Sequence, residues 1–339
     1  MRVVVLGAGG AHKTENSIVR AARASGHRCR MVNVVGWSRY AGPAARRAVR
    51  YMVEAFEPDF LLLTRHAILA GEPTLRALIG NRMAAFWYFD PQPKPAVLAL
   101  ARVVGRMYVT YLAQIDSYRA AGIEDVRFLP QGVDPAIDYP AAATRPEYLC
   151  EASFVGSGQY PYRHSLLRAV GRACGLQIRG PGWDRGSDLP VAGGEVRGKR
   201  LREVIKGARI SLGASAHPEQ DSDRASASNR MWKILGSGGF YLGPHVQDIE
   251  HFAIGGRHCA WYRSTEDAVE QVYHYLAVPE ERTRIADQGR AHALRHHTYA
   301  HRLGLLLAGG EYVLGQDSSD DGVVSKLEHP HAGHPLDHL

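Results

Sequence analysis

Cysteine is scarce in this sequence, and the four that occur are widely spaced. They stand at positions 29, 150, 174 and 259 of the 339 residues, so no Cys-x-x-Cys pair exists. This spacing argues against a zinc ribbon, a thioredoxin-type site and a dense disulfide framework. We therefore expect a protein of a reducing compartment.

Long apolar runs are also missing. The sequence has no stretch of about 18 apolar residues, and its start, Met1–Leu6, lacks the charged, apolar and small-residue sections of a signal peptide. We therefore expect a cytoplasmic protein with no transmembrane segment.

Acidic residues are outnumbered by basic ones. Lys and Arg total 41 against 34 Asp and Glu, a net charge of +7 that favours anionic partners such as nucleotides, nucleic acid or a membrane surface. The basic residues are scattered, with near-clusters only at 46–50 and 197–202, which we interpret as solvated surface. No aromatic and basic RNA-recognition signature is evident, which disfavours nucleic acid.

Apolar segments alternate between strand and helix patterns along most of the chain. Short apolar runs at 3–6, 27–35 and 60–63 alternate with helical patterns at 15–25 and 44–56, and the alternation starts again near residue 151. This order predicts an α/β protein with two Rossmann-like domains that face each other across a cleft. Parallel sheets bind ligands at the carboxyl ends of their strands, so one domain would hold a donor and the other an acceptor.

The expected domain boundaries follow from this alternation. We expect an acceptor-side domain over residues 1–135 and a donor domain over 136–300, followed by a helix at 301–315 that packs back on the first domain. The polar segment 316–339, with its four histidines, is predicted to be a disordered tail.

A glycine loop follows the first predicted strand. Gly7-Ala8-Gly9-Gly10 resembles a dinucleotide fingerprint, but the third glycine of that pattern is missing. Such a loop can also line a cleft, because a missing side chain lets a substrate approach the backbone, or it can serve turn geometry alone. We favour cleft lining, with Gly9, Gly10 and His12 on the acceptor side.

Two segments of the second half are candidates for binding a diphosphate. Gly156-Ser157-Gly158 precedes Arg163 at a predicted helix start, where backbone N–H groups and a guanidinium suit phosphates, although an ordinary loop has the same pattern. Arg230 and Lys233 lie three residues apart, on one face of a helix that Ser228 or Asn229 can cap.

Leu129–Asp134 resembles the segment that leaves the first domain of GT-B glycosyltransferases. Five further blocks, in order, resemble the CgeB-like (spore maturation protein) branch of this fold, within the glycosyl transferases group 1. They are Phe154–Ser157 with Arg163, Arg179–Trp183, Lys206–Leu212, Asn229–Gly239, and His297–Tyr299 with Arg302. The resemblance covers residues 126–305 well, and the first 125 residues only in general layout.

The resemblance implies a hexosyltransferase-type enzyme that moves a sugar from a nucleotide-diphosphate donor to an unidentified hydroxyl acceptor, with neither metal nor cofactor. It places the donor in the second domain. Gly156, Ser157, Gly158 and Arg163 would face the phosphates, and Gly182 and Trp183 the base. Asn229, Arg230, Ser237 and Gly238, with Lys233 on the same helix, would border the sugar and diphosphate.

One departure from the family pattern changes the expected chemistry. Many retaining members carry two glutamates eight residues apart, and the corresponding positions here are Ala225 and Lys233. Retaining chemistry is therefore not implied. Two alternatives stay open: a nucleotide-sugar epimerase of the same fold, and a non-catalytic protein that binds a nucleotide or nucleic acid.

An inverting transfer would need a base on the acceptor side. Asp90 is our first candidate, because it follows the aromatic strand Phe86–Phe89, although an Asp before Pro also forms turns. His66 is the rival, and Glu15 near His12 is the third candidate.

Overall fold

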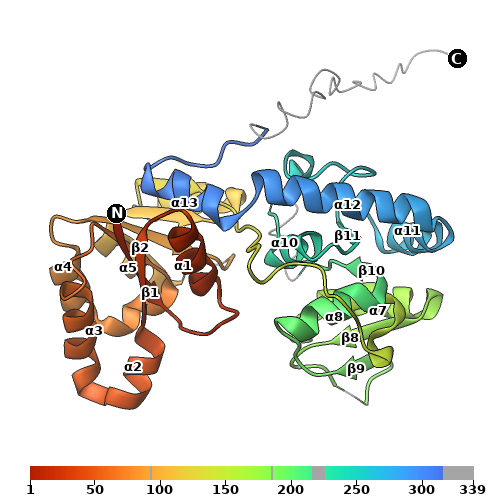
Figure 1. The fold of residues 1–339 in the computed structure, drawn as a ribbon, viewed down its shortest axis with the longest axis horizontal. Coiled ribbons are helices and arrows are strands. Elements are labelled where there is room, and N and C mark those ends of the chain that lie inside the picture. The colour runs from red at the N-terminus through yellow and green to blue at the C-terminus, as the bar shows by residue number, and fades with distance from the viewer. Residues whose placement is uncertain (92–93, 185, 216–225, 316–339) are drawn as a thin grey trace, which may run out of the picture.

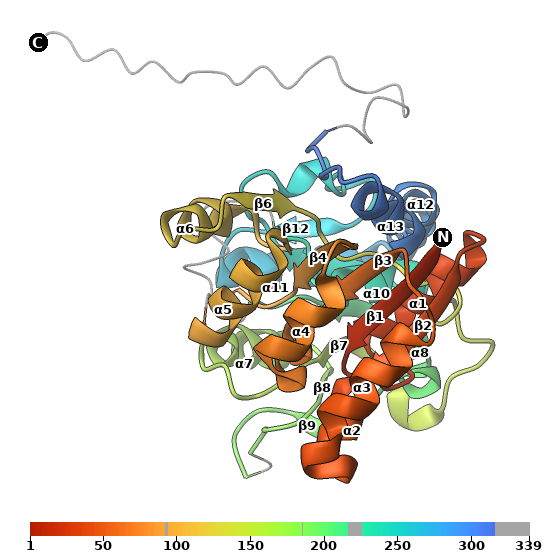
Figure 2. The ribbon, with the colours of Figure 1, turned by 90° about the vertical axis from the view of Figure 1, so that its left-hand side faces the viewer.

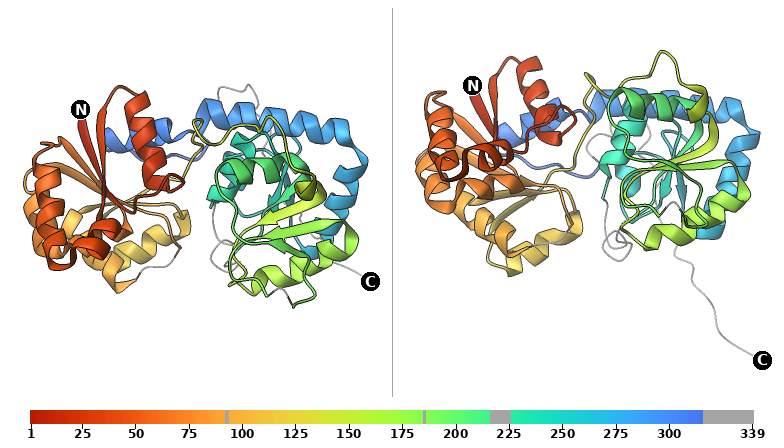
Figure 3. Two further views of the ribbon diagram at one scale, coloured as in Figure 1. Left: turned by 60° about the horizontal axis from the view of Figure 1, so that its bottom comes forward. Right: turned by 90° about the horizontal axis from the view of Figure 1, so that it is seen from below.

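The structure is a computed structural model that describes residues 1–91, 94–184, 186–215 and 226–315 (Figure 1). The tail predicted at 316–339 and position 225 lie outside these residues. Two α/β units stand side by side, and each contains a parallel six-stranded sheet. Figure 3 shows the two units joined by the chain that leaves the first sheet and by the last two helices. The prediction of two Rossmann-like domains is confirmed.

The first unit is built around the sheet β2-β1-β3-β4-β5-β6. Its elements are β1 (Arg2–Gly7), α1 (Thr14–Ala24), β2 (Arg28–Asn33), α2 (Val34–Ala41), the 3-10 turn Gly42–Ala44, α3 (Ala45–Glu54), β3 (Phe60–Leu63), the 3-10 segment Arg65–Ala70, α4 (Glu72–Ile79), β4 (Met83–Tyr88), α5 (Pro95–Val104), β5 (Arg106–Val109), the 3-10 turn Leu112–Gln114, α6 (Ile115–Ala120) and β6 (Asp125–Phe128).

Both faces of the first sheet are covered, as continuous apolar strands such as Phe60-Leu61-Leu62-Leu63 require. Alternate residues along a strand point to opposite faces, so Val4 and Leu6 join one core with α3 to α6, and Val3 and Val5 join another with α1. Figure 2 shows α3, α4 and α5 in front of the strands. The carboxyl ends of the strands stay uncovered by these helices.

The second unit is built around the sheet β12-β11-β10-β7-β8-β9. Its elements are the 3-10 turn Pro146–Tyr148, β7 (Cys150–Val155), α7 (Tyr162–Ala173), β8 (Leu176–Arg179), β9 (Val191–Gly193), α8 (Lys199–Gly207), β10 (Ala208–Leu212), α10 (Asn229–Gly236), β11 (Tyr241–Pro244), the 3-10 turn Ile249–His251, β12 (Ala260–Tyr262), α11 (Thr265–Ala277), α12 (Pro279–His296) and α13 (Tyr299–Leu307).

The strand order of each sheet reverses once. In the first sheet the reversal lies between β1 and β3, and in the second it lies between β7 and β10. At such a switch point the connections leave toward opposite faces and open a crevice at the carboxyl ends of the two strands, where ligands bind. Strand order therefore marks two places to search for a site.

The chain returns to the first unit through its last helix. α13 packs against α1, and the start of α13 is bridged to the linker by the pair Val133 and Thr298. Thr298 caps α13, accepting a hydrogen bond from the N–H of His301. The first sheet ends at Phe128 and the second begins at Cys150, and a boundary at residue 135 between them remains our proposal.

Some elements differ from those that the pattern predicts. The second strand ends at Asn33, not near Val35, because the Asn33 side chain accepts a hydrogen bond from Gly36 N and starts α2. Helices α4, α5 and α6 and the short strands β9 and β12 were not predicted. Within the described residues, no helix is long and apolar enough to cross a membrane.

His297 at the domain junction predicts acid sensitivity of the fold. It is fully buried and stacks on Trp232, and its Nδ1 lies 2.7 Å from Nη2 of Arg302. Burial, then the charges of Arg302 and His292, hold the pKa of His297 well below its ordinary 6.5. The unfolded chain therefore binds a proton that the folded chain rejects, so stability should fall as the pH drops below about 6.5.

Thermal melting between pH 8 and 5 checks this expectation. His297→Gln should flatten the acid side of the curve, whereas the exposed His274→Gln should leave it unchanged. Equal pH dependence in wild type and His297→Gln would contradict the assignment.

Candidate functional site

Two cavities lie between the domains, both bordered by residues at the carboxyl ends of strands. The larger, about 390 Å³, opens at the switch point of the second sheet, where Ser153 and Val155 of β7 stand beside Ser211 and Leu212 of β10. The second, about 270 Å³, is bordered by residues that follow β4 and β5 and by β11 and β12. Asn229 and Arg230, at the start of α10, border both cavities.

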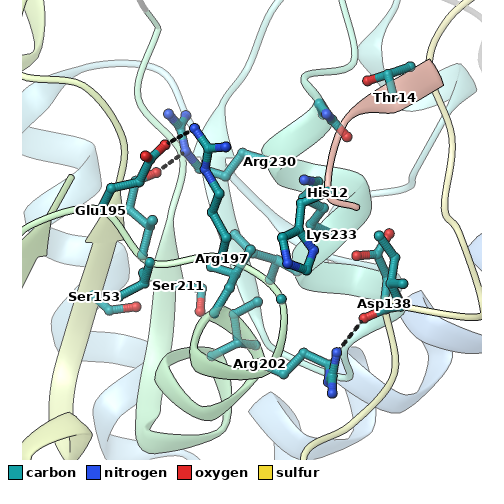
Figure 4. Close-up of a pocket in the computed structure, with 18 of the residues that line it drawn as sticks. His12, Thr14, Asp138, Ser153, Glu195, Arg197, Arg202, Ser211, Arg230 and Lys233 are labelled. Atoms are coloured by element: carbon teal, nitrogen blue, oxygen red, sulfur yellow. Dashed lines mark hydrogen bonds and ion pairs between the residues drawn. The ribbon is translucent and has the colours of Figure 1, made fainter. Parts of the chain in front are cut away.

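The larger cavity is rich in cations, and we call it the basic cavity (Figure 4). Its charged and imidazole side chains are His12, Lys13, Asp138, Glu195, Arg197, Arg202, Arg230 and Lys233. They come from the loop after β1, from the linker, from α8 with the loop before it, and from α10. Both domains thus contribute to one pocket.

Arg163 and Arg230 converge on the end of β7. The Arg230 guanidinium donates to the carbonyl oxygens of Val155, at 2.8 Å, and Ala214, at 3.3 Å, and lies over the Phe154 ring. Arg163, from α7, also lies over the Phe154 ring and donates to Ser157 O at 2.9 Å. The structure therefore brings together the two arginines that the sequence singled out, with Arg163 facing the second cavity.

The glycine loop after β7 supports these arginines and does not border either cavity. A Cβ at Gly156 would lie 2.6 Å from the Arg230 guanidinium, and one at Gly158 would lie 2.5 Å from the carbonyl oxygen of Gly182. Trp183 donates its indole N–H to Gly156 O. Gly156, Ser157, Gly158, Gly182 and Trp183 therefore pack on one another, and their contact with a ligand stays a prediction.

Ser237 and Gly238 lie away from the cleft. α10 has eight residues and so extends about 12 Å, which separates its first residue, Asn229, from the turn at its other end. Ser237 and Gly238 border a separate hollow with Pro140 and Arg282. They border neither of the two cavities between the domains, and their place beside the donor sugar stays a prediction.

Asp138 is a buried carboxylate of the basic cavity, and the part-buried Lys233 is the positive charge that most favours its ionised form. Burial lowers the pKa of the Lys233 ammonium, and the nearby Asp138 opposes that shift. Burial also raises the pKa of Asp138 to about 6, although Lys233 favours its charged form. The Asp138 carboxylate accepts a hydrogen bond from Asp134 N, and Asp134 is paired with Arg20 at 2.6 Å.

The positive charges of this cavity act on the pKa of His12. Its imidazole packs against Gly198 of the second domain, so a Cβ at Gly198 would clash with it. Burial, then the charges of Lys233 and Arg197, lower the pKa of His12 below 6.5. At neutral pH His12 is therefore uncharged, with a ring nitrogen that can accept a proton.

The glycines before His12 shape its loop. Gly9 N donates to the Asn33 side chain at 2.8 Å, and a Cβ at Gly9 would overlap that side chain. Gly10 has φ +151 and accepts hydrogen bonds from the loop and α1. Of the three predicted acceptor-side residues, only His12 borders the basic cavity.

The predicted bases Asp90 and His66 lie near one another, at the carboxyl edge of the first sheet. Asp90 forms an ion pair with Arg65, and only its neighbours Phe89 and Pro91 border the second cavity. His66 lies 3.8 Å from the buried Glu15 carboxylate. Burial disfavours the charge of Glu15, but hydrogen bonds from His66, Thr64 and the backbone hold its pKa below its ordinary value.

Sequence reasoning missed Asp138, Arg197 and Arg202 as site residues. Arg197 and Arg202 belong to a basic cluster that we interpreted as solvated surface. Arg197 is indeed about half exposed, at 51%, but it also borders the cavity, where it pairs with Glu195, and Arg202 donates to Ile137 O. For Arg197 and Arg202, the sequence signal that could have marked them was the local density of arginine at 197–202. Asp138 stands in the linker, where the sequence gives no sign that α10 will lie opposite it.

Comparison with known proteins agrees with this architecture. Residues 163–308 match the family model described as glycosyl transferase-like. Sucrose-phosphate synthase from Thermosynechococcus elongatus superposes with a TM-score of 0.60 at 14% identity, covering 91% of this chain and 98% of that one. The fold is GT-B.

Other GT-B structures are similar to the same extent. Anabaena HepE in complex with UDP-glucose superposes with a TM-score of 0.62 at 11% identity, covering 91% of this chain and all of that one. AviGT4, a glycosyltransferase involved in avilamycin A biosynthesis, gives 0.56 at 17% identity, with coverage of 91% and 99%. The comparison with curated proteins finds no match. At these identities the structures establish the GT-B fold, and the family model supports glycosyl transfer.

Proposed function

We propose that this protein transfers a hexosyl group from a nucleotide-diphosphate sugar to a hydroxyl acceptor. The observation that carries the proposal is the basic cavity, in which cations from both GT-B domains surround the switch point of the donor-side sheet. The glycosyl transferase-like match over residues 163–308 supports the reaction type. The likeness to HepE, whose structures hold UDP and UDP-glucose, supports a nucleotide-sugar donor.

The departing diphosphate would be stabilised by protein cations and backbone N–H groups. Arg230 stands at the first turn of α10, where backbone N–H groups point out of the helix, and Arg163 approaches the same strand end. Preorganised donors at the place where negative charge develops stabilise the transition state. Asn229 adds a polar side chain between the two cavities.

His12 is our choice for the acceptor-side base. It belongs to the first domain, borders the basic cavity and is uncharged at neutral pH. In an inverting transfer its ring nitrogen would take the acceptor's hydroxyl proton while the acceptor oxygen attacks the anomeric carbon and the nucleoside diphosphate leaves. Asp90 and His66 remain candidates, although neither borders a described cavity between the domains.

A thermal-shift screen with nucleotide diphosphates and sugar nucleotides tests the proposal, because a ligand of the folded state raises its apparent stability. A hit is then incubated alone and with hydroxyl acceptors. Sugar transfer only with acceptor supports the proposal, and conversion of the donor sugar alone would instead show an epimerase. Salt-sensitive nucleic-acid binding without competition from sugar nucleotides would favour the non-catalytic alternative.

Membership of the CgeB-like branch is also part of our proposal.

Metal independence gives a direct test of the role of the cations. Because Arg163 and Arg230 would supply the positive charge that a divalent cation supplies elsewhere, turnover should change less than about twofold in excess chelator. Turnover is measured with and without chelator and after addition of Mn²⁺. Loss of activity in chelator, with recovery on adding Mn²⁺, would contradict this expectation.

A further inference from the structure

The Lys233 ammonium is a part-buried positive charge in the wall of the basic cavity. Figure 4 shows its side chain beside His12, pointing away from α10. Lys233 is part-buried, yet within the described part of the chain its ammonium makes no hydrogen bond or ion pair that meets ordinary distance limits. A charge that is partly removed from water without a close partner is costly, so a protein that retains one commonly pairs it with a ligand.

No carboxylate of the described residues forms an ion pair with this ammonium. Asp138 is the acidic group that most favours its charge, and the Asp138 carboxylate accepts a hydrogen bond from Asp134 N. Glu195 is committed to Arg197, at 2.5 Å. Arg202 donates to Ile137 O and to the Tyr139 hydroxyl, which are neutral partners.

The charge balance leaves room for more than a diphosphate. Lys13, Arg197, Arg202, Arg230 and Lys233 border the cavity as cations, against the carboxylates of Asp138 and Glu195. Each of the two phosphoryl groups of a sugar nucleotide carries one negative charge in its diphosphate linkage. After such a donor has bound, one positive charge in the cavity is still without a counter-charge.

Geometry separates that remaining charge from the diphosphate position. The helix start at Asn229 and Arg230 faces both cavities, whereas Lys233 borders only the basic one. Three residues along a helix correspond to a rise of about 4.5 Å, so Lys233 lies one turn beyond the phosphate-binding end. An anionic group that meets Lys233 would thus sit on the transferred sugar or on the acceptor.

We propose that Lys233 makes the site selective for a substrate that carries an additional anionic group, a carboxylate or a phosphoryl, on one of its sugars. The inference rests on the proposed function and names the substrate class of the same site. A uronate sugar on the donor and a sugar phosphate as acceptor are the two sources of that group.

Calorimetric titration of matched pairs tests the selectivity. UDP-glucose is compared with UDP-glucuronate, GDP-mannose with GDP-mannuronate, and glucose with glucose 6-phosphate in the presence of UDP or GDP. Wild type should bind one anionic member at least about 10-fold more tightly than its neutral partner, which is the size expected for a hydrogen bond to a charged group. Lys233→Met should remove that preference, so that the variant binds the anionic and the neutral member of the pair with affinities within about threefold of each other. A preference within a sugar-nucleotide pair places the anionic group on the donor, and a preference for glucose 6-phosphate over glucose places it on the acceptor.

Thermal melting of the ligand-free variants provides an independent readout. Lys233→Met replaces a part-buried ammonium that makes no hydrogen bond or ion pair by an apolar chain of similar length, so its melting temperature should not fall markedly. Lys199→Met is the matched control on α8, where the side chain is 81% exposed, and should not change the melting temperature. A marked fall for Lys233→Met would show that Lys233 stabilises the fold itself and would count against the proposal.

Loss of the proposed function and loss of the Lys233 selectivity give different results. If no sugar nucleotide binds, both the proposed glycosyl transfer and the selectivity assigned to Lys233 are contradicted. If sugar nucleotides bind but wild type treats every matched pair equally, or if the preference survives in Lys233→Met, only the selectivity assigned to Lys233 is overturned.

Discussion

His12→Gln should lower turnover by about 100-fold or more and leave the donor affinity nearly unchanged. His12 belongs to the acceptor-side domain, and its ring nitrogen is the uncharged proton acceptor that borders the basic cavity. General bases contribute about 100-fold to 10,000-fold to such reactions. Steady-state kinetics for turnover and calorimetry for donor binding separate the two effects.

The pH profile gives this prediction a second readout. A base works only when unprotonated, so activity should fall as the pH drops through the pKa of His12, which lies below 6.5. After burial, Lys233 is the main cause of that lowering, so Lys233→Met should move the acid limb toward higher pH. The profile is measured as kcat/KM.

Asp90→Asn is the comparison that decides between the candidate bases. Asn keeps the size and the turn-forming ability of Asp, so the variant tests the carboxylate. We expect near-wild-type turnover, because Asp90 is paired with Arg65 and does not border either cavity. Full activity in His12→Gln with a 100-fold loss in Asp90→Asn would reverse our assignment, and losses in neither would make His66 the next residue to test.

Replacing Arg230 by Ala should weaken the affinity for the donor on the order of 10-fold to 100-fold. Hydrogen bonds to charged groups contribute about 1.5–3 kcal/mol, and Arg230 stands at the helix start where we place the diphosphate. Arg163→Ala and Arg230→Ala are both measured by titration with the nucleoside diphosphate found in the screen. Arg209→Ala, a 58% exposed position, is the control and should bind normally.

Arg230 also ties two strand ends together, so its variant needs a fold check. It donates to Val155 O after β7 and to Ala214 O after β10. Arg230→Lys keeps the charge but loses the planar pair of donors, and should bind donor between wild type and Arg230→Ala. Unchanged donor affinity in folded Arg163→Ala and Arg230→Ala would remove both from the site.

Local patterns were enough to predict the elements that frame the site. Alternation of apolar strands and amphipathic helices is a property of neighbouring residues, which is why β1, α1, β3, α7 and α10 could be placed from the sequence. Ser228 was also predicted as a cap, and its hydroxyl accepts a hydrogen bond from Met231 N. Arg230 and Lys233 share a helix face because they are three residues apart, which depends only on the helix period.

The tertiary structure alone decided which of these residues meet. His12 and Lys233 are 221 positions apart in the sequence, and only the order of strands in two sheets brings the first domain's loop to the second domain's switch point. The same packing fills the loop at Gly156 with Trp183, leaves Ser237 at the far end of α10, and buries Asp138 opposite Lys233. Periodicity sets the face of a helix, but the partner of that face depends on long-range packing, which no local pattern specifies.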